Sequence, residues 1–545
     1  MLFPNKKFVG SLLPHQEQNF KQLHCRKRAL LSEKAGRGKT LTSLFSWWYL
    51  HQAGVTGKLF VVCPVNAYTK KVWQKECKKH FVSVTSISWD ELVKCTLPQL
   101  MALPHDVIIL KYTSVKFKDT KAYKLVNDLF LNAPAGKMNV VLFDEVHKLK
   151  SPAAYQSNGK MYGSQVTSIW KACTKNVPIL WGLTATAYST DYSDTYHILD
   201  FIKPFVLGTL PDFKRHCCIT EEYYQVGAGW LERIVGLQEN VFFGKLNGML
   251  ITGTSSVIPK FHMHRYVMSE ETRDLYLRVA NGLAAFPSLT ADEDSHETMM
   301  KSLLSATKQE SLFQVRGSFE EAPVVDISKN SAGYVYLQYV TDGAVNSDGE
   351  FTPTETSKLQ EVLNTLHDIY SRGRSCVIYA TYYKSLDVII KAVSLLFPKA
   401  VIMENSSRSR LGENELTAQA VKNRPHFIFI TAAGSESVSF GFISDILLFN
   451  TPTTPSMFAQ VVGRILRVDT TFPGDQHVHI LYDNNVDGYK LLVVSAKAKQ
   501  ADAVQGVDLS IPSVFKNIDF SNTSWERWKK QLLWGAKISS GLLDF

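Results

Sequence analysis

The sequence lacks the features that mark a membrane protein or a disulfide-stapled secreted protein. No apolar run approaches the ~20 residues that a membrane-spanning helix needs, and the first residues have no apolar core of the signal-peptide kind. The eight cysteines are scattered, the only close pair is Cys217 and Cys218, and no C-x-x-C motif occurs. A zinc site and a disulfide framework are therefore disfavoured, and we expect a reducing intracellular compartment, the cytoplasm or the nucleus, with no membrane partner.

The composition is that of an ordinary globular chain. Of the 545 residues, 45% are hydrophobic and 20% are charged, and this length suits two to four domains. The formal net charge of +10 suits a polyanionic partner without demonstrating one, because net charge governs association rather than fold.

The stretch LLSEKAGRGKTLTSL, from Leu30 to Leu44, has the layout of a phosphate-binding loop. An apolar pair leads into a glycine-containing loop that ends in Lys39 and Thr40, and a helix-compatible run follows. Backbone N–H groups and the helix N-terminus can face phosphate oxygens, the lysine adds charge, and the threonine hydroxyl can ligate Mg²⁺. Glu33 stands where the full pattern has its first glycine, so the loop alone is equally compatible with a structural turn.

A pair of acidic residues, Asp144 and Glu145, follows the apolar run from Asn139 to Phe143. The run predicts a buried strand, and carboxylates at its end are costly to bury without a cation or a partner. Asp144 can hold Mg²⁺, directly or through water, and Glu145 can orient and deprotonate an attacking water. An acidic turn after a strand is the alternative interpretation. It is the weaker one, because the spacing between Lys39 and Asp144 leaves room for a few β-α units between the phosphate loop and this pair.

Three further stretches each have a functional and a structural interpretation. The Gln16 amide suits the donor and acceptor edge of adenine, although from this residue alone a helix start after Pro14 is the preferred interpretation. Residues 70–79 carry five lysines that either contact a phosphate backbone or form a solvated helix face. Thr184 and Thr186 end another predicted strand, where they either link the nucleotide site to the rest of the protein or belong to a simple turn.

A second α/β pattern begins near residue 358. Strands are predicted at residues 375–380, 427–431, 446–450 and 477–482, and no second phosphate loop appears. On one continuous helix, Gln460, Gly463, Arg464 and Arg467 would share a face. Such arginines are often solvated, but this face is better explained as reaching a γ-phosphate across a cleft.

In this order, the motifs resemble those of superfamily 2 helicases and translocases. They are LLPHQ (12–16), EKAGRGKT (33–40), VVCP with W..E (61–76), DEVH (144–147), LTAT (183–186) and QVVGRILR (460–467). The acidic-led phosphate loop, VVCP and DEVHKLKS resemble the Snf2-like DNA translocases. DEVH, LTAT and GRILR also resemble the XPB and UvsW type of DNA helicase.

The resemblance implies an α/β fold with two RecA-like parallel-sheet lobes facing each other across an ATP cleft, and a helical insertion between the lobes. The expected domains are a first lobe at residues 1–215, a connecting region at 216–355, a second lobe at 356–500 and a C-terminal docking tail at 501–545.

The resemblance also assigns roles to residues, with ATP and Mg²⁺ as cofactors. The implied catalytic residues are Lys39, Glu145, Arg464 and Arg467. The implied ATP-binding residues are Gln16, Glu33, Lys34, Ala35, Gly36, Arg37, Gly38, Lys39, Thr40, Gln460 and Gly463. The implied Mg²⁺ ligands are Thr40 and Asp144, and the implied coupling residues are Thr184 and Thr186.

The function that the resemblance implies is an ATP-dependent DNA helicase or translocase that grips duplex or branched DNA mainly by its backbone. An RNA helicase is one alternative. A motor subunit of a restriction or packaging complex and a non-catalytic DNA-binding scaffold are the others. The sequence identifies no protein partner, and a viral protein acting inside a host cell would fit the same expectations.

Overall fold

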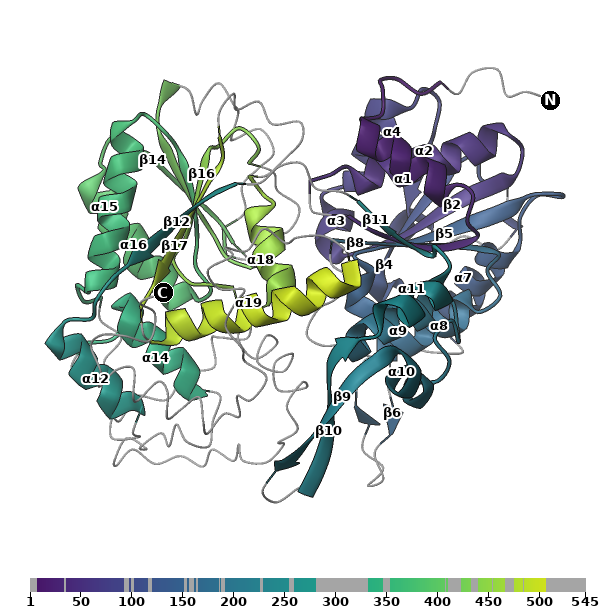
Figure 1. The fold of residues 1–545 in the computed structure, drawn as a ribbon. Helices are drawn as coiled ribbons and strands as arrows, with labels where there is room; N and C mark the ends of the chain where they lie inside the picture. The colour runs from purple at the N-terminus through teal and green to yellow at the C-terminus, as the bar shows by residue number, and fades with distance from the viewer. Residues whose placement is uncertain are drawn as a thin grey trace, which may run out of the picture.

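Two parallel β-sheets, each flanked by helices, form two lobes that lie side by side (Figure 1). The computed structural model describes residues 7–33, 36–92, 98–99, 102–115, 120–150, 154–155, 161–162, 165–185, 187, 192–225, 229–253, 259–280, 332–346, 353–406, 408–409, 423–432, 440–452, 454–465, 475–483 and 485–505. Within these ranges, no helix has the length and apolar character to cross a membrane. The expected α/β class with two parallel-sheet lobes is confirmed.

The sheet of the first lobe has seven strands, all paired in parallel, and its central strands are buried apolar runs of the kind that two covered faces require. In spatial order the strands are β11 (Leu250–Thr252), β1 (Arg28–Ser32), β8 (Ile179–Thr184), β5 (Met138–Asp144), β2 (Thr56–Cys63), β4 (Val107–Lys111) and β3 (Ser86–Ser88).

Helices cover both faces of this sheet, each over its own apolar cluster. One face carries α1 (Pro14–Leu23), α2 (Lys39–Gln52), α3 (Val65–Thr69) and α4 (Val72–His80). The other carries α7 (Lys121–Leu131), α8 (Gln165–Thr174), α9 (Tyr192–Ile202), α10 (Leu210–Cys217) and α11 (Glu239–Leu246). Shorter elements are α5 (Trp89–Leu92), the 3-10 helices η1 (Tyr112–Ser114) and η2 (Val146–Leu149), and the strand pair β6 (Ala154–Tyr155) and β7 (Met161–Tyr162).

The sheet of the second lobe has six strands, again all parallel. In spatial order they are β12 (Lys260–Arg265), β17 (His477–Tyr482), β16 (Asp445–Leu448), β13 (Cys376–Tyr379), β15 (His426–Ile430) and β14 (Val401–Asn405). Its helices are α12 (Glu270–Ala280), α14 (Ala332–Asp342), α15 (Ser357–Ser371), α16 (Tyr383–Leu396), α18 (Pro455–Val462) and α19 (Val486–Gln505). All four strands predicted for this lobe are present.

The segment expected to connect the lobes contributes to both of them. Strand β11 joins the first sheet, strand β12 joins the second, and α12 and α14 pack into the apolar cluster of the second lobe. An antiparallel hairpin, β9 (Cys218–Gln225) and β10 (Gly229–Leu237), projects from the first lobe. The two edge strands escaped sequence analysis because β11 has three residues and β12 alternates histidine with other residues instead of forming an apolar run.

Helix α19 extends from the second lobe towards the first, where it packs against β10 (Figure 1). Apolar residues of α19, including Leu491 and Val494, belong to the cluster that also covers the face of the first sheet that carries α7, α8 and α9. The helix therefore ties the two lobes together. The tryptophan-rich tail predicted to dock on the core lies largely beyond it, at residues 506–545, outside the described ranges.

A buried charge network joins three helices of the second lobe. Lys358 Nζ lies 2.6 Å from Asp342 Oδ1 and 2.6 Å from Asp487 Oδ2, and all three side chains are fully buried. The Gln338 amide nitrogen donates to both aspartates, and Lys490 donates to the amide oxygen of Gln338. Because these residues belong to α14, α15 and α19, the network fixes the three helices relative to one another.

Candidate active site

The phosphate-loop sequence forms a loop between β1 and α2. Gly36 and Gly38 have φ values of +77° and +74°, a region that glycine adopts without steric cost. Gly38 is the N-cap of α2, a helix of 14 residues, so the first N–H groups of this helix have no acceptor within it and point towards the phosphate loop. Lys39 Nζ donates to the carbonyl oxygen of Glu33 over 2.8 Å. Lys34 and Ala35 lie outside the described residues.

Lys39 is surrounded by charged groups from both lobes. Burial lowers the pKa of Lys39, while the negative charges of Glu145, Asp144 and Glu33 raise it. The positive charge of Arg464, which follows α18 in the second lobe, lowers it further. Arg464 therefore lies within electrostatic reach of the phosphate loop.

Asp144 ends strand β5, and Glu145 follows it in the left-handed backbone region, with φ of +53°. A non-glycine residue in this region carries strain of about 1–3 kcal/mol, which is found most often at functional sites. Burial and the adjacent Glu145 raise the pKa of Asp144 to about 6, against the hydrogen bond from Trp73 and the charge of Lys39. The proximity of the two carboxylates makes this position favourable for a cation.

Burial raises the pKa of Glu145, but His147, Lys39 and Arg464 together outweigh burial and lower it to about 2. His147 Nδ1 lies 3.3 Å from Glu145 Oε2 and 3.0 Å from Thr184 Oγ1. Glu145 is thus held ionised at neutral pH. Thr184, at the end of β8, is connected to it through the histidine, while Thr186 lies outside the described residues.

Glu33 is a buried carboxylate held inside the phosphate loop. Asn19 Nδ2 donates to its Oε2 over 2.9 Å, and Arg37 Nε lies 3.6 Å from its Oε1. A Cβ atom added to Gly253 would overlap the carboxylate of Glu33. Gly253 is a site residue that sequence reasoning missed, and the only signal for it was a glycine after a short apolar pair.

Gln16 lies in the first turn of α1, which begins at Pro14 as the structural interpretation predicted. Its Oε1 accepts from the backbone N–H of Leu13 over 2.9 Å, so the side chain caps this helix. A Cβ atom on Gly38 would overlap its amide nitrogen. Gln16 therefore packs directly against the phosphate loop, next to the start of α2.

The predicted continuous helix through Gln460, Gly463, Arg464 and Arg467 is not formed. Helix α18 ends at Val462, Gly463 caps it, and the next N–H groups bond three residues back, as Arg464 N does to Val461 O over 3.1 Å. Glycine is a poor interior helix residue, and the carbonyl oxygen of Arg464 accepts a hydrogen bond from Phe440 N over 2.9 Å. Arg464 therefore reaches the site from a turn, and Arg467 lies outside the described residues.

The donor set fits Mg²⁺ held together with phosphates. Asp144 supplies a carboxylate, and Thr40, the second residue of α2, supplies a hydroxyl. Both are hard oxygen ligands of the kind that Mg²⁺ prefers. Among the residues that the structure describes, no group of three or more His, Cys, Asp or Glu side chains is arranged to hold a metal alone. Such a site would rely on substrate phosphates to complete its coordination.

The family model of the SNF2-related domain matches residues 15–315 of this chain. The chain is 21% identical over 500 residues to the DNA repair and recombination protein RAD54B of Gallus gallus, covering 84% of this chain and 50% of that protein. It is 21% identical over 488 residues to RDH54 of Saccharomyces cerevisiae, covering 80% and 45% of the respective chains. The chain thus spans about half the length of the curated relatives it matches.

Solved structures similar to this chain include the Sulfolobus solfataricus SWI2/SNF2 ATPase core in complex with dsDNA. The TM-score is 0.36 at 12% sequence identity, with 98% of this chain and 99% of that chain covered. The same core domain solved by itself gives a TM-score of 0.35 at 14% identity, covering 96% and 95% of the respective chains.

Proposed function

Because this chain belongs to the SNF2-related domain family, we propose that it is a DNA-dependent ATPase that couples ATP hydrolysis to movement along DNA. The observation that carries the proposal is that the charge of Arg464, from the second lobe, acts on the pKa values of Lys39 and Glu145 in the first. Groups that meet only across two lobes can make hydrolysis depend on how the lobes are arranged, and a motor needs that dependence.

In the proposed reaction, the first lobe holds the nucleotide. The N–H groups at the start of α2 and the ammonium of Lys39 bind the β- and γ-phosphates. Thr40 and Asp144 would hold Mg²⁺, which when bound neutralises charge on the phosphates. Gln16, beside the loop, contributes to recognition of the adenine. The other phosphate-loop residues contact phosphate mainly through their backbone.

Glu145 orients the attacking water and accepts its proton. Its lowered pKa means that the carboxylate is ionised at neutral pH but is a weak base, so orientation of the water is its main contribution. Arg464, and Arg467 further along the chain, would stabilise charge that develops on the γ-phosphate, an effect worth ~10³–10⁵-fold in rate for an arginine finger. His147 and Thr184 would relay changes at Glu145 to the rest of the first lobe.

Helix α4 supplies a candidate surface for the DNA backbone. Its exposed lysines, Lys75, Lys78 and Lys79, lie on one helix face because their spacing is i, i+3 and i+4, and the exposed Lys71 precedes the helix as its N-cap. Contacts of lysine with phosphates are insensitive to sequence and weaken with salt. The names of the two relatives, both DNA repair and recombination proteins, support DNA as the track.

We also propose a reducing compartment, in which the cysteines act as apolar core residues. Seven cysteines in the described part of the chain are free, and six of these are buried. Burial raises the pKa of several of the thiols, including Cys77, to about 12, and this makes them poor nucleophiles.

The deciding experiment is ATP hydrolysis measured with duplex DNA, single-stranded DNA and RNA. We expect the largest stimulation with DNA, and Lys39→Ala and Glu145→Gln should abolish turnover. The matched controls are Lys245→Ala and Glu239→Gln, exposed residues of the same lobe. Greater stimulation by RNA would favour the RNA helicase, and no turnover with any nucleic acid would favour the non-catalytic scaffold.

A further inference from the structure

Trp73 brings a hydrogen-bond donor to Asp144 from outside the phosphate loop. The side chain comes from the inner face of α4, is fully buried, and donates from Nε1 to Asp144 Oδ2 over 3.1 Å. The indole belongs to the same apolar cluster as Val61 and Leu142, which lie on the strands beneath it. Close packing in that cluster sets the direction in which the N–H group points.

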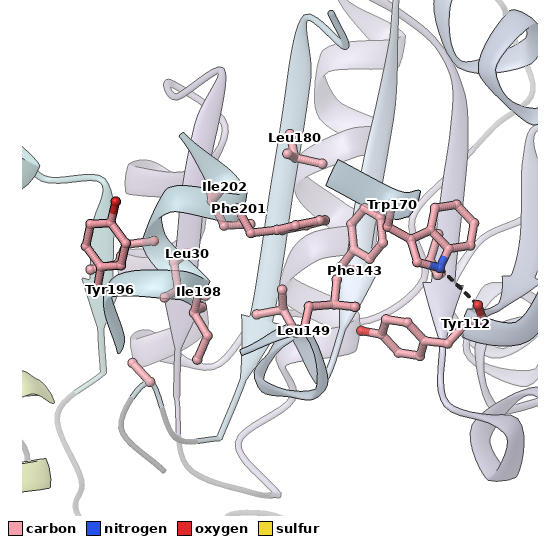
Figure 2. Close-up of a cluster of buried hydrophobic side chains, with 14 of the residues drawn as sticks. Leu30, Tyr112, Phe143, Leu149, Trp170, Leu180, Tyr196, Ile198, Phe201 and Ile202 are labelled. Atoms are coloured by element: carbon pink, nitrogen blue, oxygen red, sulfur yellow. Dashed lines mark hydrogen bonds between the residues drawn. The ribbon is translucent and has the colours of Figure 1, made fainter. Parts of the chain in front are cut away.

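Tyr112 holds the same aspartate through its main chain. Its hydroxyl, just beyond the end of β4, donates to the carbonyl oxygen of Asp144 over 2.7 Å. Its own carbonyl accepts a hydrogen bond from Trp170 Nε1 over 2.9 Å, as Figure 2 shows. Burial and the charges of Asp144 and Glu145 raise the pKa of Tyr112 well above its usual value, so the hydroxyl stays protonated and remains a donor.

These two bonds restrict different motions of Asp144. The indole engages one carboxylate oxygen and so limits rotation of the carboxyl group, which sets the direction of the other oxygen. The tyrosine fixes the backbone where β5 gives way to the left-handed Glu145. A carboxylate that must bind Mg²⁺ in near-octahedral geometry gains from both constraints.

We propose that Trp73 and Tyr112 are positioning residues that orient Asp144 for Mg²⁺ bound together with ATP. The inference rests on the proposed function of the site, and it adds two residues outside the binding set named above. Loss of an outer partner of a metal ligand typically weakens metal binding ~10–100-fold.

The proposal is tested by measuring Mn²⁺ binding in the presence of a non-hydrolysable ATP analogue. Electron paramagnetic resonance reports the concentration of the free ion. Trp73→Phe removes the N–H donor and keeps an apolar ring. Trp47→Phe is the matched control, because Trp47 is almost fully buried in the same cluster but donates to the carbonyl of Gly57 over 3.1 Å.

We expect Trp73→Phe to weaken Mn²⁺ binding about tenfold or more, while Trp47→Phe leaves it unchanged. The metal-free analogue should bind equally to both variants. In an Asp144→Asn background, Trp73→Phe should have little further effect, because its route to the metal is already lost. A general loss of stability would not produce this pattern.

Equal Mn²⁺ affinity in Trp73→Phe and Trp47→Phe would overturn the inference and leave the proposed function standing. Failure of the unmodified protein to bind Mn²⁺ with the analogue would instead refute the proposed function. Should Trp73→Phe not fold, Tyr112→Phe, which removes one hydroxyl, replaces it. Unchanged Mn²⁺ affinity in that variant would equally overturn the inference.

Discussion

Replacing Lys358 by methionine should strongly destabilise the second lobe. The ammonium is fully buried, lies 2.6 Å from each of two buried carboxylates, and sits 4.6 Å from the ring centre of Phe449. Burial lowers the pKa of Lys358, but Asp342 and Asp487 raise it more, so the lysine is charged. Removing it leaves two buried aspartates with Lys490, whose ammonium donates to Gln338, as the remaining cation of the network, at a cost of about 3–5 kcal/mol.

Differential scanning calorimetry measures this effect. For a unit of 150–250 residues, each kcal/mol changes the melting temperature by about 2–4 °C, so we expect a decrease of roughly 10 °C. Lys391→Met, on the exposed side of α16, is the control and should melt like the unmodified protein. Adding Asp342→Asn and Asp487→Asn to Lys358→Met should restore part of the loss, because both carboxylates are then neutral and Lys490, whose pKa burial lowers to about 8, can lose its proton.

The reasoning about the buried network fails if Lys358→Met melts at the same temperature as Lys391→Met. It also fails if the triple variant is less stable than Lys358→Met alone. Either result would mean that the aspartates find water or another cation in place of the lysine. The outcome bears on function because the network fixes α14, α15 and α19 in the lobe that carries Arg464.

Three further predictions concern binding, chemistry and pH. Lys75→Gln with Lys78→Gln should lower the slope of log affinity against log salt for duplex DNA by up to ~2 (≈0.9 per phosphate contact), whereas Lys245→Gln should leave it unchanged. Glu145→Gln should retain binding of ATP and of DNA, measured by direct titration, while turnover disappears; loss of ATP binding would argue against its assigned role. Burial and the neighbouring His479 and His262 lower the pKa of His264 to about 4, so the unfolded chain binds more protons between about pH 6.5 and 4 and stability should fall as pH decreases through that range. The urea midpoint should therefore change less between pH 7 and pH 5 in His264→Gln than in the exposed control His367→Gln, and an equal change in the two would contradict the assignment.

The parts of the fold that the sequence predicted are those set by local patterns. Strand β5 is an apolar run ended by carboxylates, a pattern typical of a strand buried in a parallel sheet. The glycines of the phosphate loop mark left-handed backbone before a helix, so Lys39 and Thr40 could be placed from sequence alone.

The parts that escaped prediction depend on contacts between distant residues. Strand β12 pairs with β17 although more than two hundred residues separate them, and its histidines show no apolar periodicity. Trp73 lies in the lysine-rich stretch at residues 70–79 and in the W..E motif, neither of which indicates a hydrogen bond to Asp144, because that bond joins residues far apart in the sequence. The end of α18 was misplaced because the arginine spacing fits a helix, whereas Gly463 stops it.

The central claim is that Arg464 from the second lobe acts on nucleotide held by the first, and the most direct test compares two affinities. ADP alone mimics the ground state, and ADP with aluminium fluoride mimics the transition state for phosphoryl transfer. In the presence of duplex DNA, the unmodified protein should bind the second far more tightly than the first. Arg464→Ala should lose most of that preference with its affinity for ADP unchanged. A preference that survives the substitution, or a loss confined to ADP affinity, would contradict the account.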